Sequence, residues 1–103
     1  MSPVTFVNVI EVAPSNQQAL IDLLIEGTEK VIATRQGFIS VTLLASLDGA
    51  RVINIARWES ADDVKATQSD PAAAEYAQRT AAIAQPGPGL YAVAGEFTAR
   101  GDG

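Results

Sequence analysis

In the first third of the chain the apolar positions change from a nearly continuous run to a helical spacing. Residues 4–12 (VTFVNVIEV) are β-branched and apolar and lie between two prolines, which is typical of a strand. From residue 15 to about residue 35, apolar side chains recur every three or four positions, which predicts a helix. Ser15 and Gln18 have the spacing of a capping box at its start, and Gly37 suits its end.

Two apolar segments follow with strand character and a turn between them. Residues 38–47 (FISVTLLASL) and 51–58 (RVINIARW) are rich in β-branched and large apolar side chains. Asp48-Gly49 between them is a strong hairpin signal. The pair predicts an antiparallel hairpin.

The last part of the chain predicts helix and then strand. Ser60 is expected to cap a helical segment, and Asp70-Pro71 restarts the helix with an acidic cap and a proline in its first turn. The alanine-rich stretch that follows is strongly helical. Residues 87–99 are expected to form a last strand, and the final Gly-Asp-Gly of residues 101–103 is expected to fray.

The order β-α-β-β-α-β predicts an α+β fold of the ferredoxin-like kind, an antiparallel sheet with helices on one face. We expect one domain over residues 1–103, with its core at about 4–99. Strict alternation divides the strand 38–47 into two sets: Phe38, Ser40, Thr42 and Leu44 on one face, and Ile39, Val41, Leu43 and Ala45 on the other. Both faces of the hairpin are too apolar for water, and two helices cover only one of them. A homodimer that packs sheet against sheet is therefore expected.

Two asparagines inside strands are the clearest candidates for chemistry. Asn8 lies in the first strand, and Asn54 shares a face of its own strand with Trp58, the only tryptophan in the chain. In the ferredoxin-like order these two strands are neighbours, so the three side chains can project into one space. Asparagine is depleted in strands and costly to bury unpaired. A structural role, with the amide bonded to a loop or across a dimer interface, remains open.

Composition limits the chemistry that is available. The 103 residues are 48% hydrophobic, carry a net charge of −5 and include neither histidine nor cysteine. This excludes Ser-His-Asp and Cys-His catalysis, Cys/His zinc sites and haem with a histidine or cysteine ligand. Scattered basic residues do not form a nucleic-acid footprint. Neither a membrane-spanning run nor a signal peptide is found, so a cytoplasmic location is expected.

The segments FVNVIEV, Gly37-Phe38 and NIARWES, together with the order of elements, resemble the antibiotic biosynthesis monooxygenase family, a family of dimeric α+β barrels. The resemblance spans nearly the whole chain. It implies a cofactor-independent enzyme that uses O2, without metal, haem or flavin, to convert a small aromatic such as an anthrone into a quinone. It also implies that Asn8, Asn54 and Trp58 are catalytic.

The chain departs from other members of this family at two positions. Haem-degrading relatives have a histidine where this chain has Gln68, and some anthrone oxygenases have a tyrosine where it has Val64. Classical haem degradation is therefore not expected, and tyrosine assistance at residue 64 is in doubt. Tyr76 and Arg79, one turn apart on the last helix, are candidate substitutes or a surface pair.

The resulting hypothesis is that strand amides hold an enolate or phenolate oxygen. Asn8 and Asn54 would donate to it, and Trp58 would shape the pocket and donate to substrate or to reduced oxygen. The substrate-binding candidates are Phe6, Phe38, Tyr76 and Arg79. Two alternatives stay open: a dimer that binds a small ligand without chemistry, and a non-oxidative reaction of the family on a small carbonyl compound.

Overall fold

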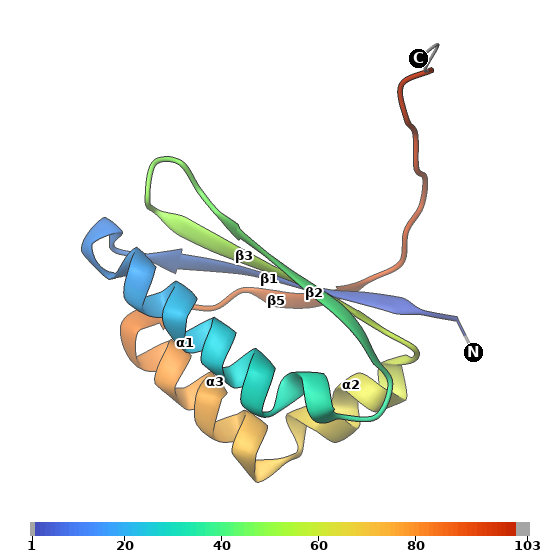
Figure 1. The fold of residues 1–103 in the computed structure, drawn as a ribbon, viewed down its shortest axis with the longest axis horizontal. Coiled ribbons are helices and arrows are strands. Elements are labelled where there is room, and N and C mark those ends of the chain that lie inside the picture. The colour runs from blue at the N-terminus through green and yellow to red at the C-terminus, as the bar shows by residue number, and fades with distance from the viewer. Residues whose placement is uncertain (1, 101–103) are drawn as a thin grey trace.

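A computed structural model describes residues 2–100 and consists of one sheet with all helices on one side (Figure 1). The strands are β1 (Val4–Val12), β2 (Phe38–Ala45), β3 (Arg51–Trp58), β4 (Ala84–Gln85) and β5 (Pro88–Tyr91). The helices are α1 (Gln17–Lys30), α2 (Ala61–Gln68) and α3 (Pro71–Ile83), with short 3₁₀ turns at η1 (Pro14–Asn16) and η2 (Ile32–Thr34). The predicted α+β, ferredoxin-like class is confirmed.

The sheet brings the two asparagine-bearing strands together. Its order is β2-β3-β1-β4, and β5 also pairs with β1; every pairing is antiparallel. In the β1–β3 register Asn8 lies directly opposite Asn54, and Val4 lies opposite Trp58. Because strand side chains alternate between faces, these four residues share one face of the sheet. The predicted proximity of Asn8 and Asn54 is confirmed.

The hairpin forms as predicted, but a β-bulge changes the faces of β2. The carboxylate of Asp48 accepts from the backbone N–H of Ala50 at 3.0 Å, and Gly49 takes φ +79°, which favours glycine. Near the start of β2 the register shifts between Phe38 and Ser40. The extra residue breaks strict alternation.

The predicted division of β2 was therefore wrong. Phe38, opposite Trp58, lies on the same face as the later residue Val41, opposite Ala56, so Ser40 belongs to the other face.

The caps of the second helical region are as predicted, and that of the first is not. The Ser60 hydroxyl accepts from the backbone N–H of Asp63 at 3.2 Å, and Asp70 accepts from Ala72 at 2.8 Å. At α1 the cap position is Asn16, whose side chain makes no capping bond, so the predicted capping box of Ser15 and Gln18 is wrong. Pro14 starts a 3₁₀ turn there, which places Ser15 inside the turn rather than before the helix.

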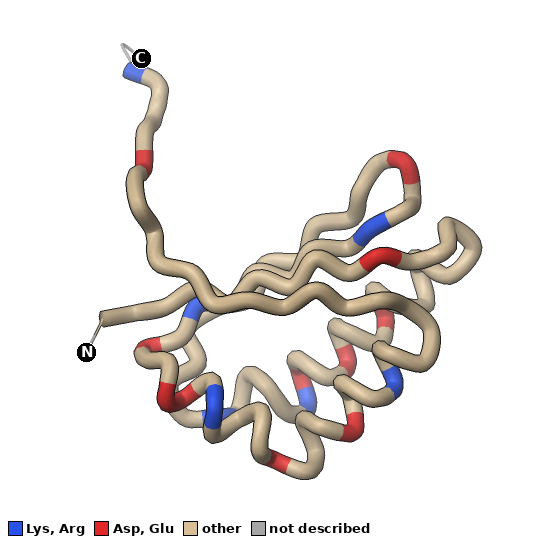
Figure 2. Tube along the Cα trace, turned by 180° about the vertical axis from the view of Figure 1, so that it is seen from behind, with Lys and Arg blue, Asp and Glu red and all other residues tan. Residues whose placement is uncertain are grey.

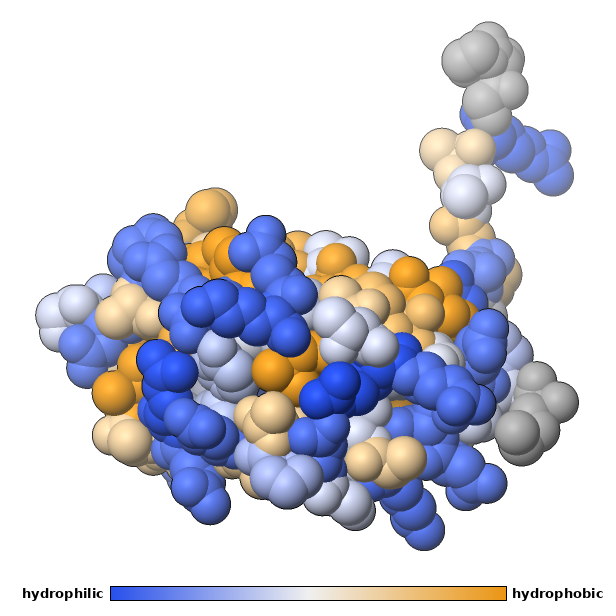
Figure 3. Space-filling model, turned by 60° about the horizontal axis from the view of Figure 1, so that its bottom comes forward, coloured by the Kyte–Doolittle hydropathy of each residue, from blue (hydrophilic) through white to orange (hydrophobic). Residues whose placement is uncertain are grey.

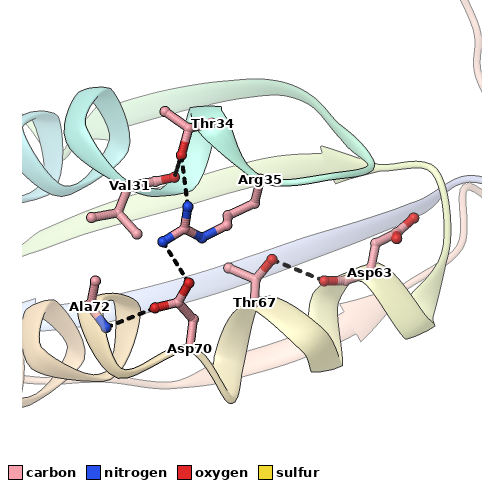
Figure 4. Close-up of polar contacts among 7 residues, drawn as sticks. All are labelled: Val31, Thr34, Arg35, Asp63, Thr67, Asp70 and Ala72. Carbon is pink, nitrogen blue, oxygen red and sulfur yellow. Dashed lines mark hydrogen bonds and ion pairs between the residues drawn. The ribbon is translucent and has the colours of Figure 1, made fainter.

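An ion pair joins the segment after η2 to the start of α3 (Figure 4). Arg35, just after η2, reaches the carboxylate of Asp70, whose other oxygen caps α3. The Arg35 side chain also donates to the hydroxyl of Thr34 at 3.0 Å. On α2, Thr67 donates to the carbonyl of Asp63 at 3.0 Å. These bonds fix the corner where α2 turns into α3.

Two buried clusters fill the space between sheet and helices. Ile10, Val12, Leu20 and Val52 pack at one end, and Ala56, Trp58 and Val64 pack at the other. All the strand residues among them belong to the face that carries Asn8 and Asn54. The asparagines thus lie between two apolar clusters, with the helices below them.

The last strand is shorter than predicted. In this part of the chain only β4 and β5 pair with the sheet, and both pair with β1. Residues 92–100 leave the sheet as an extended arm on the side away from the helices (Figure 1). The reason is that a strand needs a partner, and beyond Tyr91 the chain has passed the paired part of β1. The predicted strand to residue 99 is therefore wrong for a single chain. The final residues 101–103 lie outside the described part.

Charge is distributed unevenly over the layers. Most charged residues lie on the helices, in the hairpin turn and on the arm, whereas the strands carry few (Figure 2). Seen from the helical side, the surface is largely hydrophilic with small apolar patches (Figure 3). Within residues 2–100, none of the helices has the length and apolar character needed to cross a membrane.

Candidate active site

A cavity of about 550 Å³ lies between β1, α1 and α3, and the segment that follows α3 closes one side of it. Phe6 and Asn8 line it from the sheet, Leu24 and Gly27 from α1, and Tyr76 from α3. Its size falls in the usual range for small-molecule sites, about 300–1,000 Å³. An apolar cavity with few polar groups is suited to a flat aromatic ligand.

Asn8 is held in one orientation at the wall of this cavity. Its Oδ1 accepts from the backbone N–H of Gly87 at 2.9 Å, while the Gly87 carbonyl accepts from the backbone N–H of Val9 at 3.2 Å. Because a backbone N–H can only donate, this bond identifies which end of the Asn8 amide is oxygen. The NH2 end is left to donate elsewhere. Asn8 therefore offers the cavity a fixed donor.

Gly87 was missed as a functional residue. A Cβ at this position would lie 2.9 Å from the carbonyl oxygen of Val9, so only glycine allows the close approach that brings its N–H to Asn8. The Pro-Gly-Pro run at 86–88 was the available signal, since a glycine between prolines marks a special backbone position. Pro86 and Pro88 both line the cavity.

The other small polar side chains of the cavity are already engaged. The hydroxyls of Thr28, Thr67 and Thr80 each donate to the carbonyl four residues earlier in their own helices, at 2.7, 3.0 and 2.9 Å. A hydroxyl has one proton, so these threonines have none left for a ligand. Gln68 and Gln78 also line the cavity but are exposed. The half-buried Asn8 is the best-placed neutral donor.

Asn54 contributes a buried acceptor beside Asn8. Its Oδ1 is buried and lacks a hydrogen-bond partner among the described residues, although Asn54 itself is not among the residues that line the cavity. Directly opposite residues in an antiparallel pair have Cβ atoms about 4.5–5.5 Å apart. A buried acceptor without a donor costs about 1–3 kcal/mol. Each such atom in a native structure calls for an explanation, such as a bound water, a ligand or a catalytic role.

Trp58 and Phe38 lie in the core rather than at the cavity. Trp58 is 3% exposed, and its ring meets that of Phe38 edge to face with centroids 5.6 Å apart. Val64, the position at which some relatives have tyrosine, packs in the same cluster. Phe6 packs against this cluster and also lines the cavity. Trp58 therefore belongs to the cluster on which the cavity residue Phe6 packs, and its proposed contact with substrate stays a prediction.

Tyr76 and Arg79 meet a third residue, Glu26 of α1, that the sequence analysis missed. Tyr76 donates to Glu26 Oε2 at 2.7 Å, and Arg79 Nη1 lies 3.4 Å from the same oxygen. The Arg79 guanidinium carbon is 5.0 Å from the centroid of the Tyr76 ring. The ring lines the cavity, while both polar ends point to Glu26. Glu26 could not be identified from the sequence because it lies 50 residues from Tyr76. The spacing of residues within each helix does not reveal which face of α1 packs against α3.

This cluster changes the pKa values of two of its members. The hydrogen bond from Tyr76 is the main cause that lowers the pKa of Glu26, and the positive charges of Lys30 and Arg79 add to it. The same bond to the Glu26 carboxylate raises the pKa of the Tyr76 phenol, since the bond is lost when the phenol ionises. At neutral pH the cluster is thus a carboxylate held by a neutral phenol and two cations.

The described part of the chain contains no cluster of three or more acidic side chains that could hold a metal ion.

Comparisons with known proteins agree with the fold. Residues 3–79 match the antibiotic biosynthesis monooxygenase family. The chain therefore belongs to this family, and the expected class, a monooxygenase of this fold, is confirmed.

Three proteins of known description are similar to this chain. The chain is 37% identical to the tetracenomycin-F1 monooxygenase of Streptomyces glaucescens over 95 residues, which are 92% of this chain and 85% of the relative. The ActVA-Orf6 monooxygenase of Streptomyces coelicolor, solved with the ligand nanaomycin D, is 27% identical, with a TM-score of 0.84 over 96% of this chain and 94% of that one. SnoaB of Streptomyces nogalater, a cofactor-independent oxygenase, is 25% identical, with a TM-score of 0.77 over 94% and 98%.

Proposed function

We propose that the protein is a cofactor-independent monooxygenase that oxidises a small, electron-rich aromatic of the anthrone or phenol type to a quinone. The observation that carries the proposal is the fixed NH2 of Asn8 at the wall of an apolar cavity, directly opposite the unpartnered Oδ1 of Asn54. The names of the relatives support the reaction class, since one is a tetracenomycin-F1 monooxygenase and another a cofactor-independent oxygenase.

The first task of the site is to stabilise a substrate anion. An anthrone reacts with O2 once it loses a proton and becomes an enolate. The NH2 of Asn8 donates to the enolate oxygen, and donors of this kind contribute roughly 3–4 kcal/mol in well-formed oxyanion sites. Asn54 does not line the cavity as it stands, and we propose that its side chain turns toward the bound substrate and gives the anion a second NH2 donor beside Asn8. The apolar wall strengthens both interactions by excluding water.

The oxidation then proceeds without metal or flavin. The enolate passes one electron to O2, and the substrate radical and superoxide combine to form a carbon–oxygen bond. Protonation gives a hydroperoxide at the former CH2 carbon. Loss of that carbon's remaining hydrogen as a proton, with cleavage of the O–O bond, leaves a carbonyl and releases water. One O2 is consumed for each quinone and each water formed, and the substrate supplies all four electrons that reduce O2.

The test is O2 uptake with dithranol, a simple anthrone, by chelator-treated protein. Uptake well above autoxidation, with one O2 per quinone, is expected for the wild type. Asn8→Ala and Asn54→Ala are expected to lower kcat by about 10²–10³-fold, the usual effect of removing one oxyanion donor. Asn16→Ala is the matched control, because Asn16 is exposed and makes no side-chain capping bond.

The outcomes separate this function from the alternatives. Tight binding of dithranol with uptake no faster than autoxidation would favour a ligand-binding protein. Conversion of a substrate without O2 uptake would favour a non-oxidative reaction. Full activity of Asn8→Ala and Asn54→Ala would show that the strand amides do not carry the chemistry.

We also propose that the protein works as a homodimer joined through the outer face of the sheet. That face carries, by the register, Val7, Val9, Leu44, Ile53 and Ile55. No helix among residues 2–100 covers it (Figure 1). Val9 and Leu44 are 39% and 46% exposed, so the face is an apolar surface open to water. A second copy would cover it, since the same patch on both subunits is self-complementary.

The arm of residues 92–100 supports the same assembly. It leaves the sheet on the side of the uncovered face (Figure 1). Val93 and Phe97, two residues of strand character, are 60% and 95% exposed. A second subunit on that face would give the arm both a partner strand and an apolar surface.

A further inference from the structure

The Tyr76 ring forms part of the cavity wall where α1 and α3 meet. The ring rests on the backbone of Gly27, which is buried. A Cβ at position 27 would lie 3.0 Å from two carbons of the ring, closer than nearly all contacts of real Cβ atoms. Glycine at this position therefore allows the ring to lie against α1 instead of further into the cavity.

The ring is held in this place from its polar end as well. Its hydroxyl donates to Glu26 at 2.7 Å, and Arg79 covers the ring and reaches the same carboxylate oxygen. Lys30 Nζ lies 3.9 Å from that oxygen. The bond from the Tyr76 hydroxyl to the Glu26 carboxylate is charge-assisted and therefore stronger than a bond between neutral groups. The phenol is thus engaged with Glu26, and the ring rather than the hydroxyl is what a ligand meets.

We propose that Tyr76 determines which aromatic substrates fit, and that Glu26 and Gly27 are positioning residues that hold its ring back against α1. This inference rests on the proposed function and adds the residues that select among its substrates. A ring fixed at the wall sets how many fused rings the cavity accepts. Gly27 sets how far the ring can withdraw, and Glu26 keeps it there.

The test measures binding rather than turnover. The affinities of bicyclic, tricyclic and tetracyclic hydroxyquinones are measured by calorimetry on the 103-residue chain. Tyr76→Ala removes the ring and is expected to shift the affinity ratio of tetracycle to bicycle at least about tenfold in favour of the tetracycle, the effect of 1.4 kcal/mol. Gly27→Ala pushes the ring into the cavity and is expected to shift the ratio the other way.

Further variants separate positioning from general destabilisation. Tyr76→Phe keeps the ring but loses its bond to Glu26, so it is expected to weaken the preference as Glu26→Ala does, and less than Tyr76→Ala does. Glu26→Ala frees the phenol and is expected to weaken the preference, whereas Glu26→Gln, which still accepts a hydrogen bond, restores it. Glu29→Gln changes a neighbouring exposed carboxylate of α1 and is expected to have no effect. Circular dichroism of each variant checks that it is folded.

Each outcome decides between the two proposals. Affinity ratios that stay within about twofold in folded Tyr76→Ala, less than 0.5 kcal/mol, would overturn the inference. Shifted ratios without O2 uptake by the wild type would keep the inference about the wall and overturn the oxygenase. Failure of the wild type to bind any of the three quinones would overturn both.

Discussion

At the scale of single residues, one backbone N–H decides how Asn8 faces the cavity. Gly87 donates to its Oδ1, and Gly87 in turn is placed by its bond with Val9. The three cavity threonines illustrate the opposite case, because their hydroxyls are bonded within their helices. A polar residue at the wall is useful to a ligand only where its neighbours leave one of its groups free.

Gly87→Ala tests this arrangement. The new Cβ would lie 2.9 Å from the Val9 carbonyl oxygen, so the segment must move away from β1. We expect a loss of stability of about 1–3 kcal/mol from overpacking. We also expect a fall in kcat on the order of 10- to 100-fold as Asn8 loses its fixed orientation. Chemical denaturation and O2 uptake measure the two effects, with the exposed Gln85→Ala as control. Undiminished kcat would show that Asn8 does not need this bond.

At the scale of elements, the contact between α1 and α3 depends on charge. The folded pKa of Glu26 is lowered from 4.5, so its contribution to stability is present above about 4.5 and is lost as pH falls through the folded value. The pKa of Tyr76 is raised from 10.0, so its contribution is present below 10.0 and is lost as pH rises through the folded value. The Glu26–Tyr76 bond thus stabilises the protein between these limits.

The prediction is a pH-dependent difference in Tm between the wild type and Tyr76→Phe. The difference is expected to be largest and constant from about pH 6 to pH 9, and to shrink at lower and at higher pH, as the two pKa shifts require. Thermal unfolding followed by circular dichroism measures it. A difference in Tm that does not change with pH would contradict a role for the Glu26–Tyr76 bond in the contact between α1 and α3.

The corner between α2 and α3 depends on Asp70, which both caps α3 and pairs with Arg35 (Figure 4). Asp70→Ala removes both interactions and is expected to cost about 1–2 kcal/mol, since a cap contributes typically ~1 and a partly exposed ion pair at most about 1. Asp70→Asn keeps a capping oxygen and is expected to cost less than about 1 kcal/mol. Denaturant unfolding measures both. Equal losses would assign the effect to the ion pair alone.

At the scale of the whole molecule, one side of the sheet holds the cavity and the other is an apolar face that none of the described helices covers. Ile55→Lys places a charge in the middle of the uncovered face, opposite Val7 and Thr42 in the register. Sedimentation equilibrium is expected to give twice the chain mass for the wild type and the single chain mass for this variant. Ile25→Lys, on the exposed side of α1, is the control and should leave the mass unchanged. A wild-type protein with the mass of one chain would refute the dimer.

Much of the fold follows from local patterns in the sequence. The strands 4–12 and 51–58, the hairpin turn and the caps Ser60 and Asp70 all depend on neighbouring residues, and all are present. The bulge near Ile39 and the short β5 were missed, because each depends on which strand lies alongside. Local sequence does not encode that choice.

Some contacts of the site could likewise be predicted from the sequence, and others could not. The pairing of Asn8 with Asn54 could be predicted from strand order and alternation. The contact of Glu26 with Tyr76 could not, because 50 residues separate the two and the angle between α1 and α3 brings them together. The edge-to-face contact of Phe38 with Trp58 also depends on the bulge, which puts Phe38 on the same face as Val41.

The central claim is that the strand amides stabilise the substrate's anion, and the ionisation of bound dithranol tests it most directly. Without O2 the enolate accumulates and its absorbance can be followed against pH. We expect dithranol bound to the wild type to ionise at a pH about two to three units lower than free dithranol, as one donor of roughly 3–4 kcal/mol implies. In Asn8→Ala this difference should largely disappear although binding persists. The same ionisation in the wild type, in Asn8→Ala and in free solution would contradict the account.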